Sequence, residues 1–249
     1  MRGLGVVLLF TFLLPGPGVG GQPVKDHPGI GGHRLAPGGR NVCWSEPADL
    51  NGMIGSSEQI LMFGIETEIA NDFLIDGTVI TRASWWGGYF ANDLPCDELP
   101  PSPGFNLRFY EDAQCLPAAV VADLPITNYT QELVDCVWGV LPIYKWSADL
   151  DLNLSANVRY WFGAQMMDHP FPPQAGRLAT IRVTGCESVF KSAFFGYPDW
   201  TPCIDVFGVA FDSSQEFECA IPSPTAPSTW GAIKGMYLRQ DVSPPLTLF

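Results

Sequence analysis

The sequence predicts an all-β protein: an antiparallel, jelly-roll-like β-sandwich with a signal peptide and a short helical or irregular C-terminal tail. Three observations lead to this class. Short apolar or alternating runs recur between residues 60 and 219, separated by clusters of Gly, Pro, Asn and Asp. No run there has the length and 3.6-residue period of an amphipathic helix. No unit of about 20–50 residues repeats, which argues against a propeller or a solenoid.

The N-terminus has the features of a secretory signal peptide. Arg2 precedes an apolar run from Leu4 to Leu14, and small residues follow from Gly16 to Gly21. This run is shorter than the roughly 20 residues that span a bilayer. We therefore expect a signal peptide over residues 1–21, secretion or cell-surface localisation, and no transmembrane segment after cleavage.

Composition divides the rest of the chain into three parts. Residues 22–42 are rich in Gly and Pro and are expected to form a flexible leader. The β-sandwich domain is expected over residues 43–222. A Pro-rich spacer and a C-terminal segment occupy residues 223–249, where the apolar spacing from Trp230 to Leu238 is typical of a short amphipathic helix.

The expected strands begin near residue 59. Two apolar runs, 59–75 and 77–90, meet at an Asp76-Gly77 turn signal, and the prolines of 95–104 indicate a loop. The segment 105–112 alternates, with Phe105 on one face and Arg108 on the other. Further strands are expected, in order, within residues 130–155, 158–166, 178–185, 187–197 and 204–212.

Two adjacent tryptophans near the end of the run 77–90 must point to opposite faces of a sheet. Trp85 shares its parity with Ala83 and is assigned to the core. Trp86 shares its parity with Arg82, and a Gly87-Gly88 turn is expected to follow it. We expect a loop to cover Trp86 in preference to a sugar ring.

Seven cysteines lie after the signal peptide. In an exported chain they favour disulfides, and the absence of any C-x-x-C pair gives a zinc site little support. Connectivity cannot be read from sequence; the interpretation adopted pairs Cys96 with Cys115 and Cys186 with Cys203. The odd count leaves one thiol unpaired or available for an intermolecular bond.

Charge narrows the classes of partner. Asp and Glu outnumber Lys and Arg by 26 to 13, which gives a formal net charge of −13. Such a surface repels nucleic-acid phosphates and disfavours docking on anionic lipid. We expect no nucleic-acid partner, whereas a neutral glycan, a cell-surface component or a metal ion is compatible with this charge.

Catalysis has no motif in this chain. There is no G-x-S-x-G, and His169 is the only histidine within the expected domain, so a serine triad has little support. Acidic residues are numerous, but no spacing singles out the pair that a glycosidase needs. The sequence therefore predicts a protein that is not an enzyme, with hydrolase activity as the alternative.

No cofactor is expected, apart from a candidate structural Ca²⁺. Asp149, Asp151 and Asn153 have the i, i+2, i+4 spacing of an EF-hand loop, but Leu154 replaces its glycine and Tyr160 its final glutamate. On a strand, the same spacing makes a polar outer face. Loop acids form the other candidate metal site: Asp97, Glu98, Glu111 and Asp112.

Aromatic side chains are the candidates for carbohydrate binding, since sugar rings stack on exposed aromatic platforms and large aromatics also fill sandwich cores. Trp138, Trp146 and Trp161 lie within apolar runs and are assigned to the core. The candidates expected near turns are Trp86, Tyr89, Tyr197 and Trp200.

Three segments carry a family resemblance: "NDFLIDGTVITRASWWGGYF", "PGFNLRFYED" and "YKWSADLDLNLSANVRYWFGAQ". Their order over residues 60–215 resembles a β-sandwich domain of secreted bacterial proteins in the loosely defined choice-of-anchor group. "STWGAIKGMYLR" is similar to the T-W-G-x-I-K endings of exported bacterial proteins, although Met236 and Leu238 depart from that pattern. The resemblance implies secretion and implies no catalytic residue.

Together these features predict a secreted or cell-surface, non-catalytic interaction module of unknown ligand. The alternative is a carbohydrate-binding module that uses exposed aromatics. A second alternative is a self-assembling extracellular structural protein, joined through the odd cysteine.

Overall fold

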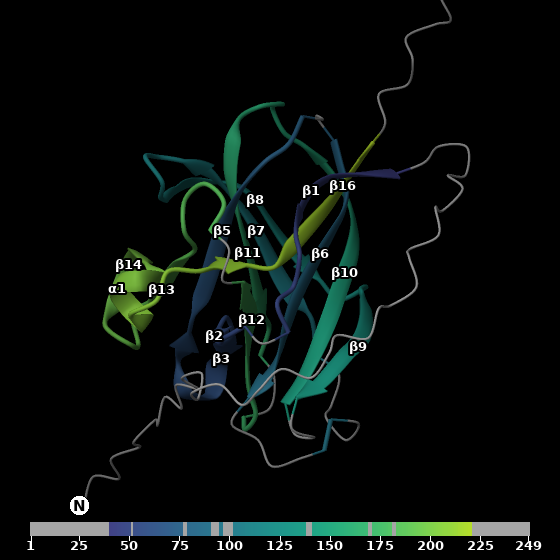
Figure 1. The fold of residues 1–249 in the computed structure, drawn as a ribbon. Helices are drawn as coiled ribbons and strands as arrows, with labels where there is room; N and C mark the ends of the chain where they lie inside the picture. Colours follow the sequence, from purple (N-terminus) through teal and green to yellow (C-terminus); the bar gives the residue numbers. More distant parts are fainter. Residues whose placement is uncertain are drawn as a thin grey trace, which may run out of the picture.

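The computed structural model describes residues 40–50, 52–76, 79–90, 95–96, 102–137, 141–168, 171–180 and 183–220. Two antiparallel sheets pack face to face, with β13, β14 and α1 at one side (Figure 1). The predicted all-β, antiparallel sandwich is confirmed. The expected signal peptide, most of the leader and the tail from residue 223 lie outside the described residues.

The eight-stranded sheet is centred on the long strand β6. Its main path is β1 (Arg40–Glu46), β16 (Gln215–Ala220), β6 (Val79–Phe90), β10 (Leu141–Asn153) and β9 (Thr130–Val137). β12 (Gln174–Thr180) pairs with the second half of β6 and also with β2 (Ile54–Ser56) and β15 (Asp212–Ser213).

The six-stranded sheet forms the other layer. In order across the sheet, its strands are β14 (Tyr197–Pro202), β13 (Val189–Ser192), β5 (Glu68–Leu74), β11 (Arg159–Met166), β7 (Phe105–Asp112) and β8 (Pro117–Ile126). Before β5, the short strands β3 (Gln59–Ile60) and β4 (Ile65–Glu66) flank the 3₁₀ turn η1 (Leu61–Phe63).

Alternating side chains build the core between the sheets. On β7, Phe105 and Phe109 point inward and are almost fully buried, whereas Arg108 and Tyr110 point outward, as the parity of this segment predicts. Phe73 of one sheet meets Phe217 of the other, with ring centroids 4.5 Å apart. Interlocking aromatics of this kind account for much of the apolar burial that stabilises the sandwich.

The two adjacent tryptophans follow their predicted parity. Trp85 is 1% exposed, and its ring centroid lies 4.9 Å from that of Phe105 in the core. Trp86, on the other face, is 9% exposed and belongs to a cluster against which Ala48 and Leu50 pack. Protein therefore covers Trp86, as expected.

The predicted Gly87-Gly88 turn is wrong, because β6 continues through both glycines to Phe90. A Cβ on Gly87 would lie 2.0 Å from the Gly176 carbonyl oxygen, and one on Gly88 would lie 2.1 Å from that of Pro142. These glycines allow neighbouring strands to approach closely, so the glycine pair serves sheet packing and not a turn.

Other boundaries also differ from expectation. Residues Arg40–Val42, assigned to the leader, begin β1. The segment 117–126 forms the edge strand β8, which was not predicted, and the run 204–212 begins within the helix α1 (Cys203–Phe207). Gly208, with φ of 75°, ends this helix in the left-handed conformation that glycine readily adopts.

The disulfides join Cys43 to Cys219, Cys96 to Cys136 and Cys115 to Cys186. The predicted pairs Cys96–Cys115 and Cys186–Cys203 are therefore wrong. The sheet brings the β7–β8 turn beside the segment before β13, which places Cys115 and Cys186 together despite 71 residues of separation. Cys203 is the unpaired cysteine and is fully buried, so the intermolecular bond proposed for the odd cysteine is blocked in the folded protein.

Three disulfides are typical of proteins that fold in an oxidising compartment. In the part of the chain that the structure describes, no helix has the length and apolar character required to cross a membrane.

Candidate functional site

A row of charged side chains crosses the outer face of the six-stranded sheet. The strand register places Lys191 of β13 beside Glu68 of β5, and Arg108 of β7 beside Asp123 of β8. β11 lies between β5 and β7, and there Gly163 faces Arg108. The row therefore has charges of alternating sign on four strands, with a glycine at its centre.

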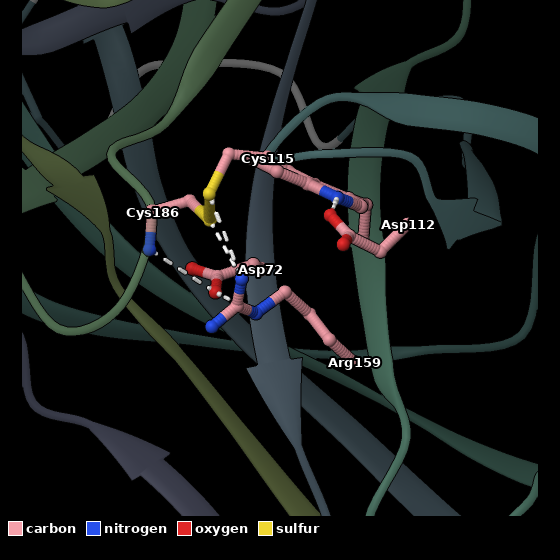
Figure 2. Close-up of a disulfide and its surroundings, with 6 residues drawn as sticks. Asp72, Asp112, Cys115, Arg159 and Cys186 are labelled. Carbon is pink, nitrogen blue, oxygen red and sulfur yellow. Dashed lines mark hydrogen bonds and ion pairs between the residues drawn. A yellow bond between two sulfur atoms is a disulfide. The ribbon is translucent and has the colours of Figure 1, made fainter.

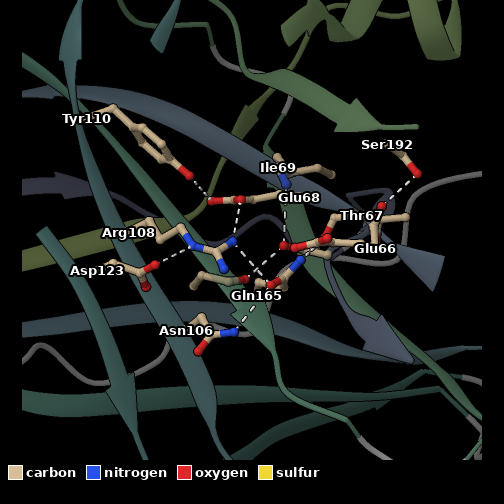
Figure 3. Close-up of polar contacts among 12 residues, drawn as sticks. Glu66, Thr67, Glu68, Ile69, Asn106, Arg108, Tyr110, Asp123, Gln165 and Ser192 are labelled. Carbon is tan, nitrogen blue, oxygen red and sulfur yellow. Dashed lines mark hydrogen bonds and ion pairs between the residues drawn. The ribbon is translucent and has the colours of Figure 1, made fainter. Parts of the chain in front are cut away.

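Gly163 allows the two halves of this row to meet. A Cβ at this position would lie only 2.2 Å from Glu68 Oε1. Because glycine has no side chain, the Glu68 carboxylate lies across β11 and reaches β7. There Arg108 Nη1 donates to Glu68 Oε2 at 2.8 Å, and the Tyr110 hydroxyl donates to Glu68 Oε1 at 2.7 Å (Figure 3).

Neighbouring polar groups hold Arg108 in place. Its Nε donates to Asp123 Oδ2 at 3.2 Å, and its Nη1 also donates to Gln165 Oε1 at 3.2 Å. The Gln165 amide donates in turn to the Thr67 carbonyl at 2.9 Å (Figure 3). Gln165 therefore links the network to the backbone, which fixes the direction of the guanidinium.

Burial controls the electrostatics of this network. Burial raises the pKa of Glu68, while the positive charge of Arg108 and the hydrogen bond from Tyr110 act to lower it. Burial, and then the negative charge of Glu68, raise the pKa of the Tyr110 hydroxyl. The side chains of Glu68 and Arg108 are 8% and 16% exposed, so they form a largely desolvated ion pair.

A cavity of about 390 Å³ opens above the network. Glu68, Arg108 and Tyr110 contribute to its lining from the sheet, and Lys191 and Phe194 contribute from β13 and the turn after it. This volume is within the usual range for small-molecule sites, which combine apolar walls with a few oriented polar groups. The arrangement can bind a polar ligand that carries hydrogen-bond acceptors and one apolar face.

The predicted aromatic residues do not form one platform. Trp86 and Tyr89 are buried in the eight-stranded sheet, on the part of β6 that continues through the glycine pair, so neither ring is exposed for a sugar to stack on. Tyr197 packs against Phe190. Trp200 is half-buried beside the cavity, with its ring centroid 5.4 Å from that of Tyr110, which lines it.

The predicted metal ligands are only partly described. Asp97 and Glu98 lie outside the described residues. Glu111 and Asp112 are consecutive on β7 and so point to opposite faces, and Asp112 Oδ1 accepts a hydrogen bond from Trp161 Nε1 at 2.9 Å. Within the described ranges, no group of three or more His, Cys, Asp and Glu side chains is arranged to hold a metal ion.

The alternative calcium ligands lie on a strand. Asp149, Asp151 and Asn153 are exposed along β10, on the polar outer face that their spacing also predicts. Asp149 Oδ1 lies 3.3 Å from Arg82 Nη1, an ion pair on the sheet surface. This strand geometry differs from the loop that wraps a Ca²⁺ ion in an EF-hand.

Sequence reasoning missed Glu68, Arg108 and Tyr110 as a group. Alternation along 105–112 placed Arg108 and Tyr110 on one outward face, and this was the available signal. The contribution of Glu68 depends on the order of strands β5, β11 and β7 and on Gly163, which local patterns do not reveal.

Comparison of the chain with protein-family models, curated proteins and solved structures gave no match.

Proposed function

We propose that this protein is a secreted or cell-surface interaction module without catalytic activity, and that it binds its ligand in the cavity above Glu68 and Arg108. The three disulfides and the signal-like N-terminus support export. The choice-of-anchor resemblance is part of this proposal and points to a bacterial cell surface.

The ion pair of Glu68 and Arg108 is the observation that carries the proposal. A desolvated ion pair adds little net stability, and well-packed apolar residues of similar size often replace one without loss. Here the pair lies on the floor of a cavity, where three hydrogen bonds orient the guanidinium. Desolvating this ion pair costs free energy, and the Arg108 guanidinium has a fixed orientation beside a cavity. Recognition of a ligand best explains both features.

Two features favour binding over catalysis. Both carboxylate oxygens of Glu68 accept hydrogen bonds within the protein, one from Tyr110 and one from Arg108. Among the residues described, the hydrogen bonds of Arg108 involve Nε and Nη1, so we propose that Nη2 donates to the ligand. A ligand can therefore accept hydrogen bonds from oriented donors. Catalysis by Glu68 would require one of its carboxylate oxygens to leave its present hydrogen-bond partner and reach the substrate.

A carbohydrate is the alternative that a specific observation favours. Sugar hydroxyls both donate and accept, and Arg108, Glu68 and the Tyr110 hydroxyl place donors and acceptors next to one another. Trp200 adds a half-buried ring beside them, in contact with Tyr110. We propose that a neutral glycan would engage these groups, with Trp200 as the one predicted aromatic still positioned for this role.

Self-assembly is the second alternative, and the edge strand β8 is the feature that favours it. β8 pairs with β7 alone among the described strands, and Val120 and Val121 on it are 56% and 39% exposed. An exposed apolar edge strand is a template for pairing with another chain. A β-bulge between Ala122 and Val120 interrupts the ladder there, a device that discourages such pairing.

A glycan array and retention on insoluble polysaccharides test these functions together. Lys191→Ala and Phe194→Ala alter exposed parts of the cavity rim with little expected effect on folding, and Leu133→Ala, on the exposed surface of β9, is the matched control. We expect rim variants to lose retention at least about fivefold, and the control to retain it.

Two outcomes would contradict the binding proposal, and a third would favour self-assembly. Equal retention by rim and control variants would place the ligand elsewhere. Release of soluble sugar that Glu68→Gln abolishes would show a hydrolase. A dimer or larger species in size-exclusion chromatography, lost on Val120→Lys, would favour self-assembly through β8.

A further inference from the structure

The disulfide Cys115–Cys186 differs from the other two in its exposure. It links the turn between β7 and β8 to the segment before β13. Cys115 is exposed, whereas Cys186 is 5% exposed. Gln114 and Cys115 both adopt left-handed backbone conformations, with φ of 57° and 65°, which carry Cys115 around the outside of a tight turn. Cys115 is therefore the exposed residue of the pair, and Cys186 is the enclosed one.

Arg159 contacts both sulfurs of this disulfide. Its Nη1 donates to Cys186 Sγ at 3.0 Å and to Cys115 Sγ at 3.5 Å (Figure 2). Its Nε lies 3.1 Å from Asp72 Oδ2, and the backbone N–H of Cys186 donates to the same oxygen at 3.2 Å. Asp72 therefore orients the guanidinium against the buried sulfur.

Two acidic groups lie near the disulfide. Asp72 accepts from Arg159, and Asp112, which accepts from Trp161, is close enough to raise the pKa of Asp72. Their negative charges oppose a thiolate, so the direct N–H contacts from Arg159 are the local source of stabilisation. The same charges repel a reagent that carries a carboxylate or another anionic group. A thiol with no charged group besides its sulfur therefore approaches Cys115 more readily.

We propose that Cys115 is a thiol-exchange site that accepts a small neutral thiol. The incoming thiolate attacks Cys115 Sγ, and a new S–S bond forms there. The Cys115–Cys186 bond breaks, and its electron pair departs on Cys186 Sγ, where Arg159 stabilises the thiolate. The product is a mixed disulfide on Cys115 and a free thiol on Cys186; a second thiol molecule would release Cys115 as a thiol and leave as the oxidised dimer.

The other disulfides are internal references for this chemistry. Cys219 is 3% and Cys96 is 6% exposed, and their partners Cys43 and Cys136 are half-buried. Within the described ranges, no basic side chain contacts the sulfurs of either pair. Access to the attacked sulfur and stabilisation of the leaving sulfur thus coincide at Cys115–Cys186.

The test uses the full folded chain and 2-mercaptoethanol, a neutral thiol. After timed exposure and alkylation, non-reducing peptide mass spectrometry locates the adduct and the released thiol. We expect the adduct on Cys115 and the alkyl group on Cys186, at a rate at least about tenfold above that of the other disulfides. An adduct that forms first on Cys186, or first at another disulfide, would overturn the proposal. Reduction of all three disulfides at the same rate would also overturn it.

Variants separate the charge of Arg159 from its role in packing. Arg159→Gln should slow exchange about three- to tenfold, because the leaving thiolate loses a charged donor. Asp72→Asn keeps a side-chain oxygen that can accept from Arg159 and removes a negative charge that opposes the thiolate, so it should not slow exchange. Arg82→Gln, which removes an arginine from the other sheet, is the matched control and should leave the rate unchanged.

If Arg159 only held the segment around Cys186 in place, Arg159→Gln would speed the exchange reaction instead of slowing it. Loosening the segment around Cys186 would expose the disulfide, so faster exchange in Arg159→Gln would refute the proposed stabilisation. Circular dichroism checks that the variant is folded. If it is not, the position of the adduct in the wild-type chain still decides whether Cys115 is the site of exchange.

Discussion

Two arginines of this sandwich, Arg108, which is half-buried, and Arg177, which is fully buried, are stabilised in different ways. Arg108 lies on the outer face, bonded to the Glu68 carboxylate, and that charge raises its pKa against the effect of burial. Arg177 lies in the interior, where burial lowers its pKa to about 10. Its guanidinium donates to the carbonyls of Phe162 and Ser214 at 2.9 and 3.2 Å, and to Gln215.

The difference separates a structural site from a recognition site. Neutral acceptors from both sheets enclose Arg177, and it touches no cavity among those described. Arg108 is bonded on one side and faces a cavity on the other. A buried charge that is wholly enclosed stabilises one arrangement of the core, whereas one that borders a cavity retains the capacity to bind a ligand.

The largest expected effect follows replacement of the enclosed arginine. Arg177→Met keeps most of the side-chain volume but leaves the Phe162 and Ser214 carbonyls without their donor. We expect the free energy of unfolding to fall by about 3–5 kcal/mol, measured by urea denaturation. A loss below about 1 kcal/mol would show that the interior cluster contributes no more than a surface ion pair.

The acidic groups near Arg177 should make stability fall as pH rises. Burial, followed by the negative charge of Asp212, raises the pKa of Glu46 to about 8 from an ordinary value of 4.5. Because folded Glu46 holds its proton more tightly than unfolded Glu46, its contribution to the free energy of unfolding decreases between these two pH values and is constant outside them.

We expect this decrease to be about 2–4 kcal/mol in urea denaturation at about pH 5 and pH 8.5. Glu46→Gln cannot ionise and should flatten the profile. Burial also raises the pKa of Asp212 to about 7 and that of Asp72 to about 6, so a smaller decrease should persist in this variant. A wild-type profile that rises over this range would contradict the interpretation.

The outer ion pair should separate stability from binding. Glu68→Gln removes the buried carboxylate beside Arg108 and leaves it the exposed Asp123, and we expect a loss of about 2–3 kcal/mol in unfolding free energy. The double variant Glu68→Met with Arg108→Met removes both charges and should return to within about 1 kcal/mol of the wild type. If the double variant also kept full ligand retention, the pair would have no role in recognition.

The smallest expected effect concerns the glycine beneath Glu68. Gly163→Ala places a methyl group 2.2 Å from Glu68 Oε1, the oxygen that accepts from the Tyr110 hydroxyl, so the carboxylate must move. We expect a loss of about 1–2 kcal/mol by urea denaturation. Adding Glu68→Ala removes the overlap, so the two changes together should cost less than the sum of each alone.

Local patterns determined much of this architecture. The punctuated apolar runs predicted an antiparallel sandwich, and strand parity assigned Trp85 to the core and Trp86 to a covered outer face. Parity acts through the backbone, because consecutive side chains of a strand point to opposite faces whatever the rest of the fold. The charge and the cysteine content likewise follow from composition alone.

Long-range arrangement decided the rest. Cys115 pairs with Cys186 because the segment before β13 passes over the β7–β8 turn, and no spacing rule encodes that contact. The Glu68–Arg108 pair requires β11 to lie between β5 and β7, with glycine at the crossing point. The sequence by itself determined how side chains alternate between the two faces along a strand. Only the tertiary structure decided which strands lie side by side, because strand order depends on packing between distant segments.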